Sequence, residues 1–385
     1  MKRFIASLSL LALGSCSAQT DTLSIGHAQL SDLIAKQGVD PPAVIVPYRL
    51  SREMKEWAHE LVPASVVEDS KRLRLLTTAL LRKSTFGITY DRNHTATAEQ
   101  VFETRTANCL AFTNLFVGMA REIGIPVYFV EVRDVKSYRK EGDLIVVSDH
   151  VAVGFGPSHD TRVFDFGFDA SSDHGSRRVV RISDYRAIAM YYSNRGAEYL
   201  RAEEYESAVQ WLRTAVAIDP DYASSWVNLG VSLRRAGRIE AAEAAYRTAL
   251  EIDIGSVSAF QNLAALRQSQ GHVEEALDLL AMSDRANNRN PYTYLTLGDL
   301  SMRHGRIEEA GHYYRKGVRL RASEAEPLAA MGLWELSQGE DRKARRLLRK
   351  AERANSSSAR IGLLRRRLEA DESDPLLDSD HEACC

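Results

Sequence analysis

The strongest constraint on the fold of this chain is a repeat of 34 residues in its second half. Four kinds of position recur at this interval: a small residue, the position just before it, an aromatic or apolar position four residues before it, and a later alanine. In that order the members are Gly196, Gly230, Ala264, Gly298 and Gly332; Arg195, Leu229, Leu263, Leu297 and Met331; Tyr192, Trp226, Phe260, Tyr294 and Leu328; Ala208, Ala242, Ala276, Ala310 and Ala344. One period kept by several series indicates a single structural unit that is copied and stacked.

Each unit is predicted to be a pair of helices joined by a tight turn. The turn position holds Gly237, Gly271, Gly305 and Gly339, with Glu203 in the first unit. This pattern resembles the tetratricopeptide (TPR) repeat, a helix–turn–helix unit of 34 residues. The resemblance implies an all-α TPR superhelical solenoid. Its units are residues 189–222, 223–256, 257–290, 291–324 and 325–358, and residues 359–370 form a capping helix.

The resemblance to TPR proteins also implies a protein partner, because such arrays bind an extended peptide or another domain in their concave groove. The fifth position of each unit is expected to face that groove. These positions are Ser193, Val227, Gln261, Leu295 and Ala329. None of them is Lys, so the sequence does not support the subtype that clamps a peptide's terminal carboxylate.

The near-neutral net charge of −2 gives no reason to expect a nucleic-acid partner, but it hides a local contrast. Residues 342–367 hold eleven basic residues and one acid, whereas residues 369–382 hold seven acids and no base. We interpret these as a solvated cap followed by an acidic tail, residues 371–385. The alternatives are a tail that docks on the cap and a cap that contacts anionic lipid headgroups. The terminal pair Cys384 and Cys385 has no explanation in the sequence.

The first residues read as an export signal. Lys2 and Arg3 precede an apolar run of about ten residues, which is too short to span a membrane as a helix. The segment ends in Leu-Gly-Ser-Cys at 13–16 and resembles the lipobox of bacterial lipoproteins. The resemblance implies removal of residues 1–15, lipidation of Cys16 and a lipid anchor in the cell envelope, with the outer membrane facing the periplasm as the expected site. The alternative is an ordinary signal peptide cleaved after Ala18, which leaves a free periplasmic protein.

Cys109 is the one cysteine left in the folded body once the anchor and the terminal pair are set aside. Residues 51–61, 67–82 and 97–104 have the apolar spacing of helices, and residues 16–50 form a tether and N-terminal segment. From Cys109 onward apolar residues recur at helical spacing until Gly124 and Pro126. A thiol at a helix N-terminus is in a position that favours the thiolate.

Three segments with strand character follow this helix, at 127–135, 144–155 and 161–168. Residues 156–160 read as the turn of a hairpin, which brings the last two strands together. His150 and Asp165 then lie toward the far ends of these neighbouring strands. A carboxylate one strand away can hold an imidazole in a fixed orientation and tautomer.

The order of Cys, His and Asp on a helix start and two strands resembles the transglutaminase-like superfamily. The resemblance implies an α+β domain over residues 51–188, with Cys109 as nucleophile, His150 as general base and acid, and Asp165 as the residue that orients His150. The backbone N–H of Cys109 would be one oxyanion donor. Tyr90 and Asn108 are candidates for a second donor. The sequence departs from many members at Ala107, Leu110 and 151–153, around the oxyanion region and the pocket.

These features predict a cysteine amide hydrolase or acyltransferase that works through a thioester, with peptide or amide hydrolysis favoured over cross-linking. The rival is an inactive scaffold lipoprotein whose repeats mediate protein–protein interaction, and a third interpretation is a regulatory module for a membrane system. Other candidate bases are His94, His159 and His174, and Asp169 competes with Asp165. No cofactor and no metal is expected. The substrate, the groove ligand and the oligomeric state stay open.

Overall fold

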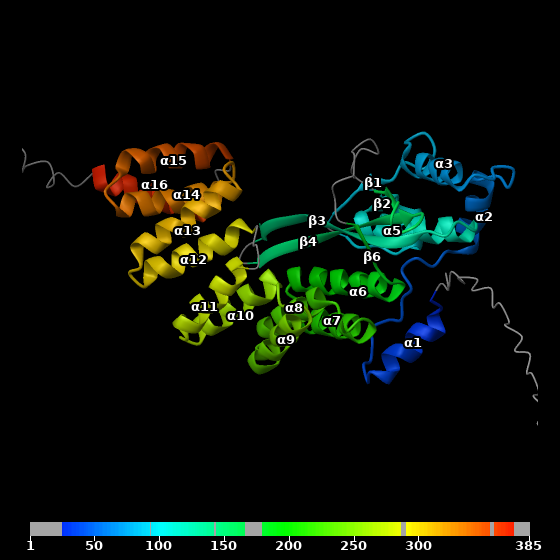
Figure 1. Cartoon of the computed structure of the whole chain (residues 1–385), viewed down its shortest axis with the longest axis horizontal. Helices are drawn as coiled ribbons and strands as arrows, with labels where there is room; N and C mark the ends of the chain where they lie inside the picture. The colour runs from blue at the N-terminus through cyan, green and yellow to red at the C-terminus, as the bar shows by residue number, and fades with distance from the viewer. Residues whose placement is uncertain are drawn as a thin grey trace, which may run out of the picture.

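The computed structural model describes residues 25–92, 94–141, 144–165, 179–285, 290–354 and 358–372. The proposed signal peptide, Cys16, His174, Asp169 and the pair Cys384–Cys385 lie outside these ranges. An α+β domain and an array of paired helices make up the described part (Figure 1).

The α+β domain begins with helices whose ends follow from local capping. The helices are α1 (His27–Lys36), α2 (Arg52–Leu61), α3 (Asp69–Leu81), α4 (Ala98–Thr104) and α5 (Cys109–Glu122). The Ser51 side chain accepts from the backbone N–H of Met54 and starts α2. Thr97 and Gln100 form a reciprocal capping box that starts α4.

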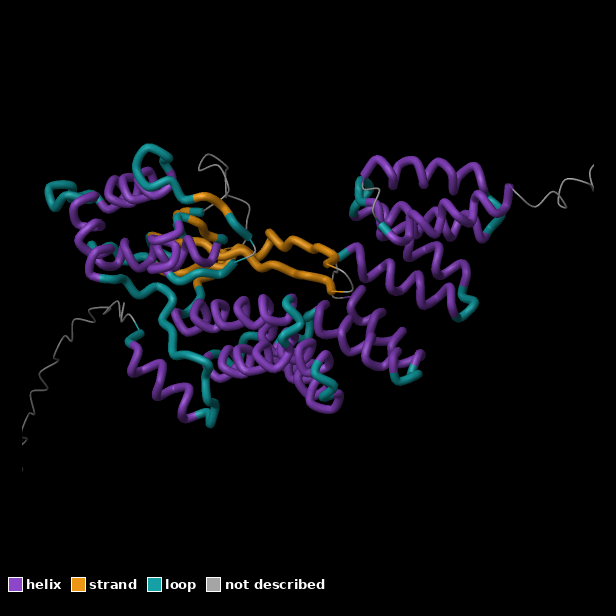
Figure 2. Tube along the Cα trace, turned by 180° about the vertical axis from the view of Figure 1, so that it is seen from behind, coloured by secondary structure: helices purple, strands orange, loops and turns teal. Residues whose placement is uncertain are grey.

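The sheet that carries the site has the strand order β5-β4-β3-β6. Its strands are β3 (Tyr128–Glu141), β4 (Leu144–Phe155), β5 (Arg162–Phe164) and β6 (Val179–Arg181), all antiparallel to their neighbours. A short parallel pair, β1 (Thr89–Tyr90) with β2 (Thr106–Ala107), lies just before α5. Figure 2 shows β3 and β4 as a long hairpin that extends beyond the body of the domain. The predicted strand at 127–135 is longer in the structure, because pairing with β4 extends β3 to Glu141. Of the strand predicted at 161–168, Arg162–Phe164 form β5, and residues 166–168 lie outside the described ranges.

Ten helices form five antiparallel pairs in the array. They are α6 (Asp184–Arg201) with α7 (Tyr205–Ile218), α8 (Ala223–Arg235) with α9 (Ile239–Ile252), α10 (Val257–Ser269) with α11 (Val273–Arg285), α12 (Pro291–Arg303) with α13 (Ile307–Leu320), and α14 (Ala325–Ser337) with α15 (Asp341–Ala354). Helix α16 (Ala359–Glu372) packs on α14 and α15 at the end. This arrangement is the TPR-type solenoid that the period predicts.

The small residues of the repeat allow the two helices of a unit to approach closely. A Cβ atom added at Gly230 would lie 2.4 Å from the ring of Tyr246 on the paired helix, and one at Gly298 would lie 2.4 Å from the ring of Tyr314. The turn residues adopt positive φ, for example 77° at Gly237. Glu203 adopts φ 63° at the same position in the first unit, so the turn keeps its geometry without glycine.

The first pair of helices shares its core with the α+β domain. Tyr192 of α6 and Trp211 of α7 belong to the same buried cluster as Phe112 and Phe116 of α5. The Tyr192 hydroxyl also donates to the carbonyl of Ala43 at 2.7 Å. Helix α6 starts at Asp184, ahead of the expected start of the repeats at residue 189, and Figure 1 shows it beside the sheet. The first repeat is therefore packed into the domain that precedes it.

Within the described ranges, no helix combines the length and the apolar character needed to cross a membrane.

Candidate active site

Cys109 is the first residue of helix α5, and its side chain is partly exposed and unpaired with another cysteine. The N-cap is Asn108, whose side-chain Oδ1 accepts from the backbone N–H of Ala111 at 2.8 Å. The rest of the helix is buried among apolar neighbours. A buried, capped helix therefore holds the thiol at its positive end, where an anion is favoured.

His150 and Asp165 form a direct hydrogen bond across the sheet. His150 lies on β4, where it pairs with Val132 of β3, and Asp165 follows directly after β5. The His150 Nε2 and Asp165 Oδ2 atoms are 2.6 Å apart. The two side chains are only 12% and 3% exposed, so water competes weakly for this contact. The other carboxylate oxygen of Asp165, Oδ1, is buried without a hydrogen-bond partner among the described residues.

Cys109 is the second partner of the His150 imidazole. Burial lowers the pKa of His150, but the hydrogen bonds and charges of Asp165 and Cys109 outweigh it and raise the pKa to about 9. His150 is therefore an imidazolium at neutral pH. A cation beside a sulfur favours the thiolate, which is the nucleophilic form. The structure thus brings all three residues of the predicted site together, in the order Cys109, His150, Asp165.

Thr113 connects the cysteine helix to the histidine strand. Its hydroxyl lies 2.8 Å from the carbonyl oxygen of Cys109, one turn earlier on α5, and 3.3 Å from the carbonyl oxygen of Val151, next to His150. The side chain is almost fully buried. The role of Thr113 could not be predicted from the sequence, because nothing in a helix pattern shows which strand a threonine will contact.

The two candidates for a second oxyanion donor, Asn108 and Tyr90, lie in different environments. The Asn108 amide is already engaged, since its Nδ2 donates to the Thr95 hydroxyl at 2.9 Å while Oδ1 caps α5. Asn108 is therefore a structural cap in this geometry, with Oδ1 and one of its two Nδ2 hydrogens engaged. Tyr90 lies on β1 and is 51% exposed. The backbone N–H of Cys109, at the first position of α5, stays the candidate for the first oxyanion donor.

The other candidate bases within the described ranges, His94 and His159, are exposed and are not among the contacts of Cys109, His150 and Asp165. His159 is exposed in the turn between β4 and β5. His94 is exposed and contacts Arg195 and Glu198 of α6 instead. The described residues contain no group of His, Cys, Asp and Glu side chains that is arranged to hold a metal ion.

The fifth positions of the repeats do not line an open groove, which corrects our expectation. Ser193, Val227, Leu295 and Ala329 are buried and Gln261 is half-buried. The reason is that the first helix of the next unit covers this position. Ser193 accepts from Asn228 one unit later at 3.1 Å, and Val227 packs against Ala259.

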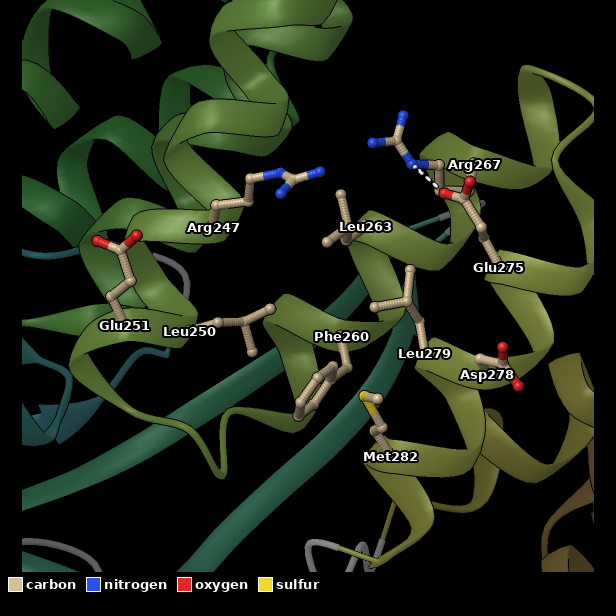
Figure 3. Close-up of a pocket in the computed structure, with 10 residues that line it drawn as sticks. All are labelled: Arg247, Leu250, Glu251, Phe260, Leu263, Arg267, Glu275, Asp278, Leu279 and Met282. Atoms are coloured by element: carbon tan, nitrogen blue, oxygen red, sulfur yellow. Dashed lines mark ion pairs between the residues drawn. The ribbon is translucent and has the colours of Figure 1, made fainter.

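A cavity of about 470 Å³ lies instead between α9, α10 and α11 (Figure 3). Its floor is apolar and includes Leu250, Phe260 and Leu279, and charged side chains surround it. One of them, Arg267, is paired with Glu275 at 2.9 Å. None of the three site residues lines this cavity, so it is separate from Cys109.

Comparisons with known families agree with this division. Residues 59–152 match the transglutaminase-like superfamily, and residues 194–257 and 291–324 match tetratricopeptide repeat models. No curated protein matches the chain.

Several solved structures resemble about half of the chain. PilF of Pseudomonas aeruginosa is 24% identical, with 50% of this chain and 87% of PilF covered and a TM-score of 0.44. TTC0263, a TPR protein of Thermus thermophilus, is 18% identical over 47% of this chain and 97% of its own, with a TM-score of 0.39. YrrB, described as a TPR protein with an unusual peptide-binding site, is 17% identical over 46% of this chain and 92% of its own, with a TM-score of 0.35.

Proposed function

We propose that this chain, in which a transglutaminase-like domain is joined to TPR repeats, is a cysteine enzyme acting on amide bonds. One observation carries the proposal. The Asp165 carboxylate holds the His150 ring at 2.6 Å, and the same ring has Cys109 at the start of α5 as its other partner. Acyl transfer by a cysteine needs these three roles: a carboxylate that orients the imidazole, an imidazole that moves protons, and a nucleophile.

In the proposed reaction the Cys109 thiolate attacks the carbonyl carbon of a substrate amide. The electron pair of the C=O bond moves to oxygen, and the backbone N–H of Cys109 stabilises that oxyanion. When the intermediate collapses, the C–N bond breaks and the His150 imidazolium gives its proton to the leaving amine. The product that stays on the enzyme is a thioester of Cys109.

In the second half of the cycle, His150 accepts a proton from water as the water oxygen attacks the thioester. The C–S bond breaks, the acid is released, and Cys109 returns to the thiolate beside a protonated His150. An amine in place of water would give a cross-link. We favour hydrolysis of peptide or related amide bonds, as in exported bacterial members that the sequence resembles.

We further propose that the protein is an envelope lipoprotein, anchored through Cys16 and facing the periplasm, with repeats that bind a protein or peptide. The basic start, the short apolar run and the Leu-Gly-Ser-Cys segment support the anchor. Metabolic labelling with a palmitate analogue tests it, with Cys16→Ser as control. Label in the wild type alone is the expected result, and no label in a bacterial host would contradict it.

Reactivity of the thiol tests the enzyme proposal. Full-length protein is treated with iodoacetamide across a range of pH, with free cysteine as reference and Cys109→Ser to show that the label is on Cys109. We expect Cys109 to react faster than free cysteine at neutral pH and His150→Ala to remove that advantage. A wild-type rate equal to free cysteine, or no effect of His150→Ala, would favour the rival function, an inactive scaffold that acts only through its repeats.

A further inference from the structure

Glu198, on the first helix of the repeat array, contacts the loop that supports the cysteine helix. Its Oε1 accepts a hydrogen bond of 2.6 Å from the backbone N–H of Thr95, which lies 103 residues earlier in the chain. Both groups are well buried, with 15% of the Glu198 side chain and 3% of Thr95 exposed. A carboxylate that accepts from a buried amide makes a strong, charge-assisted hydrogen bond.

Thr95 connects the Glu198 contact to Asn108, the N-cap residue of α5. Its hydroxyl accepts from Asn108 Nδ2 at 2.9 Å, and Asn108 Oδ1 in turn accepts from Ala111 N–H at 2.8 Å. The amide of Asn108 therefore has one orientation, because its donor and its acceptor are both engaged. Cys109 is the next residue, so the direction of its side chain and of its backbone N–H depends on this cap.

Glu198 is itself fixed by Arg195, one turn earlier on α6. The two side chains form an ion pair, and the Arg195 guanidinium lies 5.6 Å from the ring centres of Tyr199 and Trp211. Trp211 belongs to α7, the second helix of the first repeat. The first repeat thus supplies the carboxylate together with the cation and aromatic rings that hold it in place.

We propose that Glu198 is a positioning residue for the Cys109 nucleophile, acting through Thr95 and Asn108. The inference rests on the proposed cysteine chemistry. It implies that the first TPR repeat is part of the catalytic unit and is more than a binding module attached to it. Loss of the acceptor at residue 198 would leave a buried N–H unpaired and release the loop that orients the cap.

The test compares matched pairs of variants in the full-length protein. Glu198→Ala removes the acceptor, whereas Glu198→Gln keeps an oxygen for Thr95 and loses only the charge. Thr95→Val removes the hydroxyl, whereas Thr95→Ser keeps it. Glu243→Ala is the control, because Glu243 and Arg267 form an ion pair of similar exposure, 21% and 14%, within the array and away from α5.

The readouts are the iodoacetamide rate at Cys109, the pH profile of that rate and the thermal midpoint of unfolding. We expect Glu198→Ala and Thr95→Val each to slow labelling by about fivefold, which is the size of one lost buried hydrogen bond. The pH profile of labelling should also change, because Cys109 then sits less well against His150 and Asp165. Glu198→Gln, Thr95→Ser and Glu243→Ala should label within about twofold of wild type. The first keeps an oxygen for the Thr95 N–H, the second keeps the hydroxyl for Asn108, and the third leaves both residues unchanged.

Three results would overturn the inference. They are wild-type rates in Glu198→Ala and Thr95→Val, equally slow rates in Glu198→Gln, or an equal loss in Glu243→Ala, which would indicate a general effect of stability. If Glu198→Ala fails to fold, the Thr95 pair decides the question. A wild-type Cys109 no faster than free cysteine overturns the proposed function as well, whereas equal rates among variants of an activated wild type overturn this inference alone.

Discussion

The α+β domain and the repeat array differ in how far along the chain their contacts reach. The domain has one large buried cluster that joins residues from Ile25 to Ile218, besides a small one on its sheet formed by Tyr128, Val130, Val132 and Ala152. The array has a succession of smaller clusters, such as Leu200–Leu266, Ala264–Leu300 and Leu295–Met331, each confined to neighbouring units. The array's stability is therefore expected to be local, and that of the domain to depend on distant segments. The active-site candidates lie in the long-range part.

The largest expected effect is that of cutting the chain where the repeats were expected to begin. A protein ending at residue 188 loses Tyr192, Trp211 and the rest of the first repeat from the shared core. We expect it to lose cooperative unfolding, as judged by circular dichroism and urea titration. A protein ending at residue 290 keeps the first three helix pairs and should retain the domain. A cooperative fold in the shorter protein would contradict the shared core.

The next effect is a pH dependence that belongs to the domain alone. The pKa of His150 is raised from 6.5 to about 9, so the folded state binds this proton more tightly than the unfolded state. The resulting stability, on the order of 3 kcal/mol, is fully present below pH 6.5 and is lost as pH rises through about 9. We expect the difference in unfolding free energy between wild type and His150→Gln to shrink over that range. A constant difference would show that His150 titrates normally.

A smaller and more local loss is expected from Gly230→Ala. The new Cβ would lie 2.4 Å from the ring of buried Tyr246, and such overpacking costs about 2 kcal/mol. Gly237→Ala is the comparison, because its Cβ meets nothing within 4 Å and only the φ of 77° is strained, which costs about 1 kcal/mol. Urea unfolding should show the loss in the array, with Cys109 labelling unchanged. Slower labelling of Cys109 would mean that a loss of stability in the array extends to the α+β domain.

The smallest effect is expected at the surface of the array. Arg238 and Glu206 form a salt bridge of 2.6 Å between neighbouring units, with side chains 41% and 66% exposed. Such pairs contribute about 1 kcal/mol or less. Glu206→Gln should therefore leave the thermal midpoint close to that of wild type at physiological salt. A large drop would indicate that ion pairs, more than apolar packing, hold the units together.

The same contrast explains what the sequence could and could not predict. The repeat can be predicted from the sequence because the contacts that define it recur at one period. The turn recurs as well, and Glu203 adopts it without glycine. In the domain, local signals predicted helices α2 to α5 and the β4–β5 hairpin. They missed α1, β6 and the full length of β3, which depend on pairing and packing with distant segments.

The positioning residues were missed for a related reason, although one signal was present. Arg195 stands where the other units have Leu229, Leu263, Leu297 and Met331. A charge at an apolar repeat position indicates that this position serves a contact outside the repeat, and in the structure Arg195 holds Glu198. The fifth positions show the opposite error, because a family rule assigned them to a groove while the adjacent unit buries them.

The proposed function requires Asp165, His150 and Cys109 to act as one coupled unit, and an NMR titration of His150 measures that coupling. Selective histidine labelling, with His150→Gln to assign the resonance, gives the pKa in wild type, Asp165→Asn and Cys109→Ser. We expect a pKa of about 9 in wild type and a lower value in each variant. An ordinary pKa near 6.5 that neither substitution changes would contradict it.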